Sequence, residues 1–199
     1  MNGYSDVINH AFAFAAKHHD QQVRKGTRLP YLTHPASVAV ILTRYAREDD
    51  TVVAGILHDV VEDCVRGGFT QQMLERRIGE KFGDEVLQTV LAVSYRRQDD
   101  DGVELSGEDR KRDYLTRLAL AGEAALWVCA ADKLHNAASI ISDLKRTVDR
   151  GSIWNRFGGG RETTVRWYRA VYERLREISF TGEIMSELDL VTRELESFD

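Results

Sequence analysis

Hydrophobic residues recur at spacings of three and four along most of the chain, which is the pattern of helices with one buried face. Turn residues are sparse: the only prolines are Pro30 and Pro35, and the sequence lacks the many short alternating runs that a sheet protein of this size would show. The pattern therefore predicts an all-α protein, a bundle of roughly nine helices. Their expected ranges are 7–20, 38–45, 52–61, 73–78, 86–91, 114–120, 126–144, 165–178 and 184–195.

One of these expected helices, 52–61, is hydrophobic on nearly every side, which predicts that it is buried at the centre of the fold. Three stretches lack helical spacing and predict loops: a basic one at 21–33, an acidic one at 96–107, and one with three consecutive glycines at 155–161. We find no internal repeat and no long linker. We therefore expect residues 1–199 to form a single domain.

The composition excludes several classes of protein. The chain has 199 residues, of which 43% are hydrophobic, so it can fill a core and is not intrinsically disordered. Its 27 basic and 32 acidic residues give a net charge of −5, which argues against general nucleic-acid binding. No hydrophobic run reaches the roughly 20 residues of a membrane span, and no signal peptide is evident. Cys64 and Cys129 are typical of buried thiols in a reducing compartment, so we expect a cytoplasmic protein without membrane or nucleic-acid partners.

A histidine and three acids gather near the end of the buried helix. At helical spacing His58 stacks on Glu62 and Asp59 stacks on Asp63, amid hydrophobic neighbours. Three half-buried carboxylates repel one another and lose hydration, which is costly without a compensating cation. We therefore favour a bound metal over the alternative, an exposed helix end that carries ordinary charges.

Two further segments hold candidate ligands. Asp132 lies in a hydrophobic helix beside Lys133, one turn before Asn136, and the alternative for this group is a helix cap or a surface pair. His34 stands at the entrance of another helix, where a structural role is the alternative.

Together, His34, His58, Asp59 and Asp132 form a mixed nitrogen and oxygen set from three separate helices. Such a set suits Mn²⁺, Fe²⁺ or Zn²⁺ rather than Ca²⁺. No histidine lies between His58 and His135, so we expect one metal ion rather than two.

The chain resembles the HD-domain phosphohydrolases in three segments, which read RKGTRLPYLTHP, ILHDVVED and AADKLHN. More narrowly, it is similar to the (p)ppGpp hydrolase domain of RelA/SpoT proteins and to the stand-alone small alarmone hydrolases of the metazoan SpoT type. The similarity covers about 4–144, and the segment WNRFGGGRETTVRWYRAVYERL resembles the entry to that family's C-terminal helix. The family fold, an all-α helical bundle, agrees with the hydrophobic pattern.

The resemblance implies a role for each matching residue. Its metal ligands correspond to His34, His58, Asp59 and Asp132, and the family metal is Mn²⁺. Its catalytic carboxylates correspond to Glu62 and Asp63, of which we expect Glu62 to align or deprotonate a water. Its nucleotide-binding residues correspond to Arg24, Lys25, Asn136 and Ser139. A solvated loop is the alternative for Arg24 and Lys25.

Some residues fall outside this set. We expect Cys64 to be packed rather than nucleophilic, and the glycines at 158–160 to form a plain loop. We assign Trp127, Trp154, Trp167, Tyr168 and Tyr172 to the core rather than to a base-stacking surface. The segment 94–101 departs from the family pattern next to the base-binding side, so guanine specificity is the least supported part of the resemblance.

The expected activity is metal-dependent removal of the 3′-pyrophosphate of guanosine tetra- or pentaphosphate, a small-molecule nucleotide, leaving GDP or GTP. One alternative keeps the metal site but takes another phosphoester, such as a nucleoside monophosphate or the 2′-phosphate of NADPH. Another is a non-catalytic module that senses a nucleotide.

Overall fold

The computed structural model describes residues 4–65 and 68–198, and within these ranges the regular structure is helical, which confirms the all-α prediction. The first six helices are α1 (Asp6–His18), α2 (Thr33–Arg44), α3 (Asp49–Leu57), α4 (Val60–Asp63), α5 (Gln71–Phe82) and α6 (Asp84–Val93). The other five are α7 (Gly107–Leu118), α8 (Glu123–Arg146), α9 (Arg150–Trp154), α10 (Gly160–Glu177) and α11 (Ile184–Ser197).

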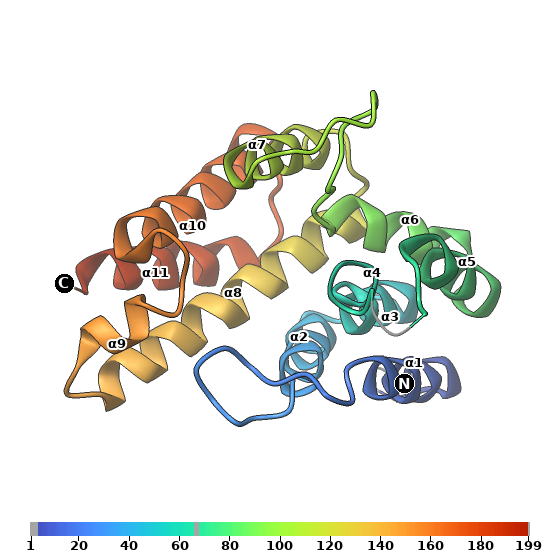
Figure 1. Ribbon diagram of the computed structural model, residues 1–199, viewed down its shortest axis with the longest axis horizontal. Coiled ribbons are helices and arrows are strands. Elements are labelled where there is room, and N and C mark those ends of the chain that lie inside the picture. Colours follow the sequence, from blue (N-terminus) through green and yellow to red (C-terminus); the bar gives the residue numbers. More distant parts are fainter. Residues whose placement is uncertain (1–3, 66–67, 199) are drawn as a thin grey trace.

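The longest helix, α8, runs through the middle of the molecule (Figure 1). It packs against α2, α3 and α6 on one side and against α10 and α11 on the other. From Ala125 to Leu134 most of its residues are buried, because the helix is covered on several faces. A helix enclosed in this way can carry charged groups into the interior, where they need partners.

The predicted central helix is present as α3, and every residue from Thr51 to Leu57 is buried. Its contact with α2 is close at Gly55, where a Cβ atom would lie 2.4 Å from Leu42 Cδ1. Glycine at this position lets the two helix backbones approach each other, which brings the ends of α2 and α3 to one place.

The expected helix 52–61 was wrong in one respect, because it is interrupted at His58 and Asp59 and resumes as the single turn α4. The His58 ring Nδ1 lies 2.8 Å from the Gly55 carbonyl oxygen, which a continuous helix would give to the backbone N–H of Asp59. Asp59 itself takes φ −91° and ψ −7°, at the edge of the helical region. The interruption turns both side chains toward α2 and α8.

Two smaller differences concern helix ends. The second helix starts at Thr33 rather than after Pro35, since proline is compatible with the first turn of a helix and leaves His34 inside it. The short helix α9 was not predicted, because five residues are too few to show a hydrophobic period.

Across the described ranges, no helix is both long and hydrophobic enough to span a membrane.

Candidate metal centre and its cavity

The four predicted metal ligands converge where α2, the α3–α4 turn and α8 meet. Nε2 of His34 lies 3.2 Å from Nε2 of His58 and 3.4 Å from Oδ2 of Asp59. Oδ1 of Asp132 lies 3.2 Å from the His34 Nε2 and 3.7 Å from the His58 Nε2. Both histidines are buried, at 1% and 3% exposure. Residues up to 98 positions apart in the sequence thus share one small interior space.

The outer sides of the imidazole rings are held so that their Nε2 atoms face this space. His58 Nδ1 donates to the Gly55 carbonyl oxygen, so Nε2 faces this space, where a bound metal ion would take the place of a proton on that nitrogen. His34 Nδ1 lies 2.7 Å from Nδ1 of His135. Such contacts on the far nitrogen are what orients histidine ligands in metal sites.

The two carboxylates are also held by neighbours. The Tyr31 hydroxyl donates to Asp59 Oδ2 over 2.5 Å, and the Lys133 ammonium donates to Asp132 Oδ2 over 2.5 Å. Asn136 donates its amide N–H to the other oxygen of Asp132. Each acid therefore keeps a fixed orientation inside the protein.

The electrostatics of this group favour positive charge. Burial lowers the pKa of His58, but the carboxylates of Asp59 and Asp132 outweigh burial and raise that pKa well above its usual value. Among the described residues, His34, His58 and Asp59 each offer a ligand atom, and these atoms lie within 4.8 Å of one another. Two imidazole nitrogens with carboxylate oxygens fit a divalent transition-metal ion, so the residues fit a metal site.

The two predicted catalytic carboxylates lie beside this centre in different surroundings. Glu62 is half-buried, and its Oε2 accepts a hydrogen bond from the Tyr95 backbone N–H over 3.0 Å. Burial and the nearby charge of Asp59 raise the pKa of Glu62 to about 7. Asp63 is more exposed, and its Oδ2 accepts a hydrogen bond from the Gln22 side-chain amide over 2.8 Å.

The predicted nucleotide-binding residues divide into two groups. Arg24 donates to Asn136 Oδ1 over 2.7 Å, and Asn136 in turn holds Asp132. Ser139 Oγ lies 3.4 Å from His135 Nε2, on the far side of the ring that contacts His34. These three residues thus contact the candidate metal ligands directly or through one neighbour, while the fourth, Lys25, lines a neighbouring cavity.

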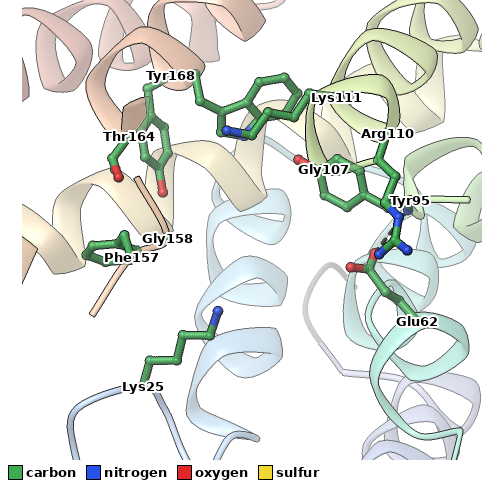
Figure 2. A pocket seen from close by; sticks show the side chains of 11 residues that line it. Lys25, Glu62, Tyr95, Gly107, Arg110, Lys111, Phe157, Gly158, Thr164 and Tyr168 are labelled. Atoms are coloured by element: carbon green, nitrogen blue, oxygen red, sulfur yellow. Dashed lines mark hydrogen bonds between the residues drawn. The ribbon is translucent and has the colours of Figure 1, made fainter. Parts of the chain in front are cut away.

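The cavity has a volume of about 330 Å³ and reaches Glu62, at the edge of the metal centre (Figure 2). Its cationic lining comes from Lys25 in the 21–33 loop and from Arg110 and Lys111 in α7. Its other lining residues are mostly aromatic or small: Tyr95, Gly107, Phe157, Gly158, Thr164, Trp167 and Tyr168.

Several lining residues correct or extend the sequence-based expectations. Trp167 and Tyr168 contribute to the cavity wall rather than only to the core, and Gly158 lies in the predicted loop and also lines the wall. Arg110 and Lys111 went unpredicted, because basic residues on an amphipathic helix look the same whether they face solvent or a cavity. The hydrogen bond from Tyr31 to Asp59 was not predicted either. The signal that could have indicated it is the position of Tyr31 inside the RKGTRLPYLTHP segment.

A family model described as an HD domain matches residues 11–162 of this chain. The chain is 36% identical to the human guanosine-3′,5′-bis(diphosphate) 3′-pyrophosphohydrolase MESH1 over 154 residues, which cover 76% of each chain. The Xenopus tropicalis protein of the same name is 35% identical over the same length. A GTP pyrophosphokinase of Myxococcus xanthus is 30% identical over 138 residues, but the match covers 68% of this chain and 17% of that protein.

Two solved structures share the fold. The structure of a metazoan SpoT orthologue, described as hydrolysing ppGpp, gives a TM-score of 0.72 at 24% identity and covers 98% of both chains. A crystal structure from Listeria monocytogenes gives a TM-score of 0.65 at 26% identity and covers 85% of this chain and 99% of that one. The chain therefore belongs to the HD-domain family and, within it, groups with the guanosine-3′,5′-bis(diphosphate) 3′-pyrophosphohydrolases.

Proposed function

We propose that this protein hydrolyses the 3′-pyrophosphate of guanosine tetra- or pentaphosphate, with Mn²⁺ as its metal ion. The observation that carries the proposal is the position of Glu62 between the candidate metal centre and a cavity with three cationic side chains. Relatives that align with 76% of this chain at 35% and 36% identity carry the name of that activity. A polyphosphate brings several negative charges, so the cations of the cavity favour it over a neutral ligand.

In this proposal His34, His58, Asp59 and Asp132 hold the metal ion. When bound, the ion supplies a Lewis acid that stabilises charge on a phosphoryl oxygen and makes hydroxide available near neutral pH. The contacts of Tyr31 and Lys133 keep the two carboxylates in place for this task. Preorganised ligands reduce the reorganisation that substrate binding would otherwise require.

Glu62 is the proposed general base, and it aligns or deprotonates the attacking water. A pKa of about 7 is well matched to proton transfer near neutral pH, because the carboxyl can both accept and return a proton. Asp63 supports this step from the solvent edge of the site. Lys25, Arg110 and Lys111 bind the phosphates. The remaining nucleotide-binding candidates, Arg24, Asn136 and Ser139, contact the nucleotide from the side of the metal ligands.

The aromatic residues of the cavity suit the nucleoside part of the substrate. Tyr95 and Trp167 have ring centroids 6.0 Å apart, and the Lys111 ammonium lies 5.4 Å from the Trp167 centroid. An aromatic face beside a cation fits a purine linked to phosphate. We propose that this wall receives the base and that α7 receives the 5′-phosphates.

The test compares Glu62→Gln with the wild-type protein in steady-state turnover of guanosine tetraphosphate. We expect kcat to fall by about 10²- to 10⁴-fold, since a general base contributes on that order, while KM changes little. Glu80→Gln is the matched control, because it makes the same substitution at an exposed position of α5, away from the site. Wild-type turnover by Glu62→Gln would refute the proposed role. Release of orthophosphate instead of pyrophosphate would mean that a terminal phosphoanhydride is cleaved rather than the 3′ ester.

A further inference from the structure

The Gln22 side chain connects a buried histidine to the outer catalytic carboxylate. Its Oε1 lies 2.6 Å from Nδ1 of His19, and its Nε2 donates to Asp63 Oδ2 over 2.8 Å. We propose that Gln22, backed by His19, is a positioning residue that sets the orientation of the Asp63 carboxylate. The proposal rests on the catalytic role proposed above for Asp63.

The chemistry of the groups fixes which way the amide of Gln22 points. A carboxylate oxygen accepts hydrogen bonds, so the atom facing Asp63 is the amide nitrogen and the atom facing His19 is the amide oxygen. The oxygen requires a donor, so His19 carries its proton on Nδ1. Burial lowers the pKa of His19, which keeps the ring neutral with one donor nitrogen. The protonation of His19 thus fixes the orientation of the Gln22 amide, and that amide fixes the orientation of the Asp63 carboxylate.

His19 can hold the Gln22 amide in place, because the His19 ring is itself fixed by its surroundings. The residue is 3% exposed, and its ring stacks on Tyr31 with centroids 4.8 Å apart. The Cys64 sulfur lies 3.3 Å from its Nδ1. Cys64 is accordingly packed, and its contact supports a histidine that faces the site.

The backbone of Gln22 is held as firmly as its side chain. Its N–H donates to the His19 carbonyl over 3.0 Å, and its carbonyl accepts from the Tyr31 N–H over 2.8 Å. The two ends of the 21–33 loop are therefore joined at Gln22. These bonds fix the backbone of Gln22, so the bridge has to order only the side-chain torsions of this residue.

Of the two proposed catalytic carboxylates, Asp63 depends more on a hydrogen-bond donor to fix its orientation. Asp63 is exposed, whereas Glu62 is half-buried and receives a backbone hydrogen bond. The terminal torsion of an aspartate is broad, so an exposed carboxylate rotates unless a donor holds one oxygen. Because Gln22 holds Oδ2, the direction of Oδ1 is fixed as well, and it can meet a water or the departing oxygen in one orientation.

The test measures guanosine tetraphosphate turnover for Gln22→Ala and Gln22→Glu in the wild-type and Asp63→Asn backgrounds. We expect Gln22→Ala to lower kcat by about tenfold to a hundredfold, the effect of losing a hydrogen bond to a charged group, with KM within about twofold. Gln22→Glu has the same shape but puts a second carboxylate beside Asp63, and we expect at least the same loss. In Asp63→Asn, followed in single turnovers with enzyme in excess, we expect Gln22→Ala to add no further loss.

The matched control is Gln71→Ala, which removes an exposed amide–carboxylate bond of the same 2.8 Å length, to Glu75 on α5. We expect it to leave kcat unchanged, and we expect the rise in Tm with Mn²⁺ to be the same in all Gln22 variants. Wild-type kcat in Gln22→Ala, full activity in Gln22→Glu, or losses that add to that of Asp63→Asn would each overturn the positioning role. Full activity in Asp63→Asn would instead refute the role of Asp63 itself.

Discussion

The ion pair between Lys133 and Asp132 leads to a prediction about stability that can be worked out from burial. Their side chains are 9% and 10% exposed, and Nζ lies 2.5 Å from Oδ2. Burial lowers the pKa of Lys133, but Asp132 raises it well above its usual value, so the lysine stays charged. Lys133→Met would keep the hydrophobic stem and remove the charge, so the buried carboxylate of Asp132 would lose its nearest cation and keep only the more distant His58, 3.7 Å away.

Breaking a buried ion pair by removing one partner costs about 3–5 kcal/mol, because the remaining charge loses its closest partner and is not solvated in exchange. For a chain of this length each kcal/mol lowers Tm by about 2–4 °C. We therefore expect Lys133→Met to melt about 6–20 °C below the wild-type protein in the presence of a chelator. Thermal unfolding followed by circular dichroism measures the difference directly.

A matched control lies on the same helix. Lys145 pairs with Glu194 at the same 2.5 Å distance, but these side chains are 57% and 34% exposed. An exposed pair contributes about 0–1 kcal/mol, so Lys145→Met is expected to lower Tm by at most about 4 °C. The contrast between the two variants isolates burial as the cause.

The same pair also predicts an interaction with metal binding. A divalent cation beside Asp132 replaces the charge that Lys133→Met removes, so saturating Mn²⁺ should raise the Tm of the variant more than that of the wild-type protein. The reasoning would be refuted if Lys133→Met melted within about 2 °C of wild type, or if it lost no more stability than Lys145→Met.

Three further predictions concern packing, pH and metal affinity. Gly55→Ala would press a methyl group against Leu42 and should lower the unfolding free energy by about 1–3 kcal/mol in urea titrations; an unchanged midpoint would contradict the close helix contact. The Arg96 hydrogen bond lowers the pKa of Asp113, so its stabilisation is fully present above about pH 4 and is lost as pH falls through the lowered pKa. Asp113→Asn should cost about 1–2 kcal/mol at pH 7, and the difference from wild type should shrink as the pH is lowered below about 4, whereas a constant difference would contradict it. Tyr31→Phe removes the hydroxyl that holds Asp59 and should weaken Mn²⁺ binding by about 10- to 100-fold in calorimetric titrations, with an unchanged affinity as the contrary result.

The helices were predictable because each buries a face at regular spacing over at least two turns. The interruption at His58 was not, because residues 52–61 keep their hydrophobic spacing across it and the break depends on a side chain that takes the Gly55 carbonyl. The helix α9 was not predicted, because its five residues are too few to show a repeating hydrophobic spacing. Local patterns thus predict the existence of helices better than their ends.

The candidate site shows a similar division. Residues with unusual chemistry in hydrophobic segments, such as His58 and Asp132, could be found because burying them requires a partner. Arg110 and Lys111 belong to a helix with an ordinary charged face, and they become cavity residues only through the placement of α7 over the site. Gln22 is an uncharged residue in a loop, and its contact with Asp63 joins positions 41 residues apart.

The most direct test of the proposed activity is to incubate the purified protein with guanosine tetraphosphate and separate the products by anion exchange, with Mn²⁺ and with chelator. We predict GDP and pyrophosphate in equal amounts with Mn²⁺, and unchanged substrate with chelator. Unchanged substrate under both conditions, or orthophosphate as the released product, would contradict the proposed 3′-pyrophosphate hydrolysis.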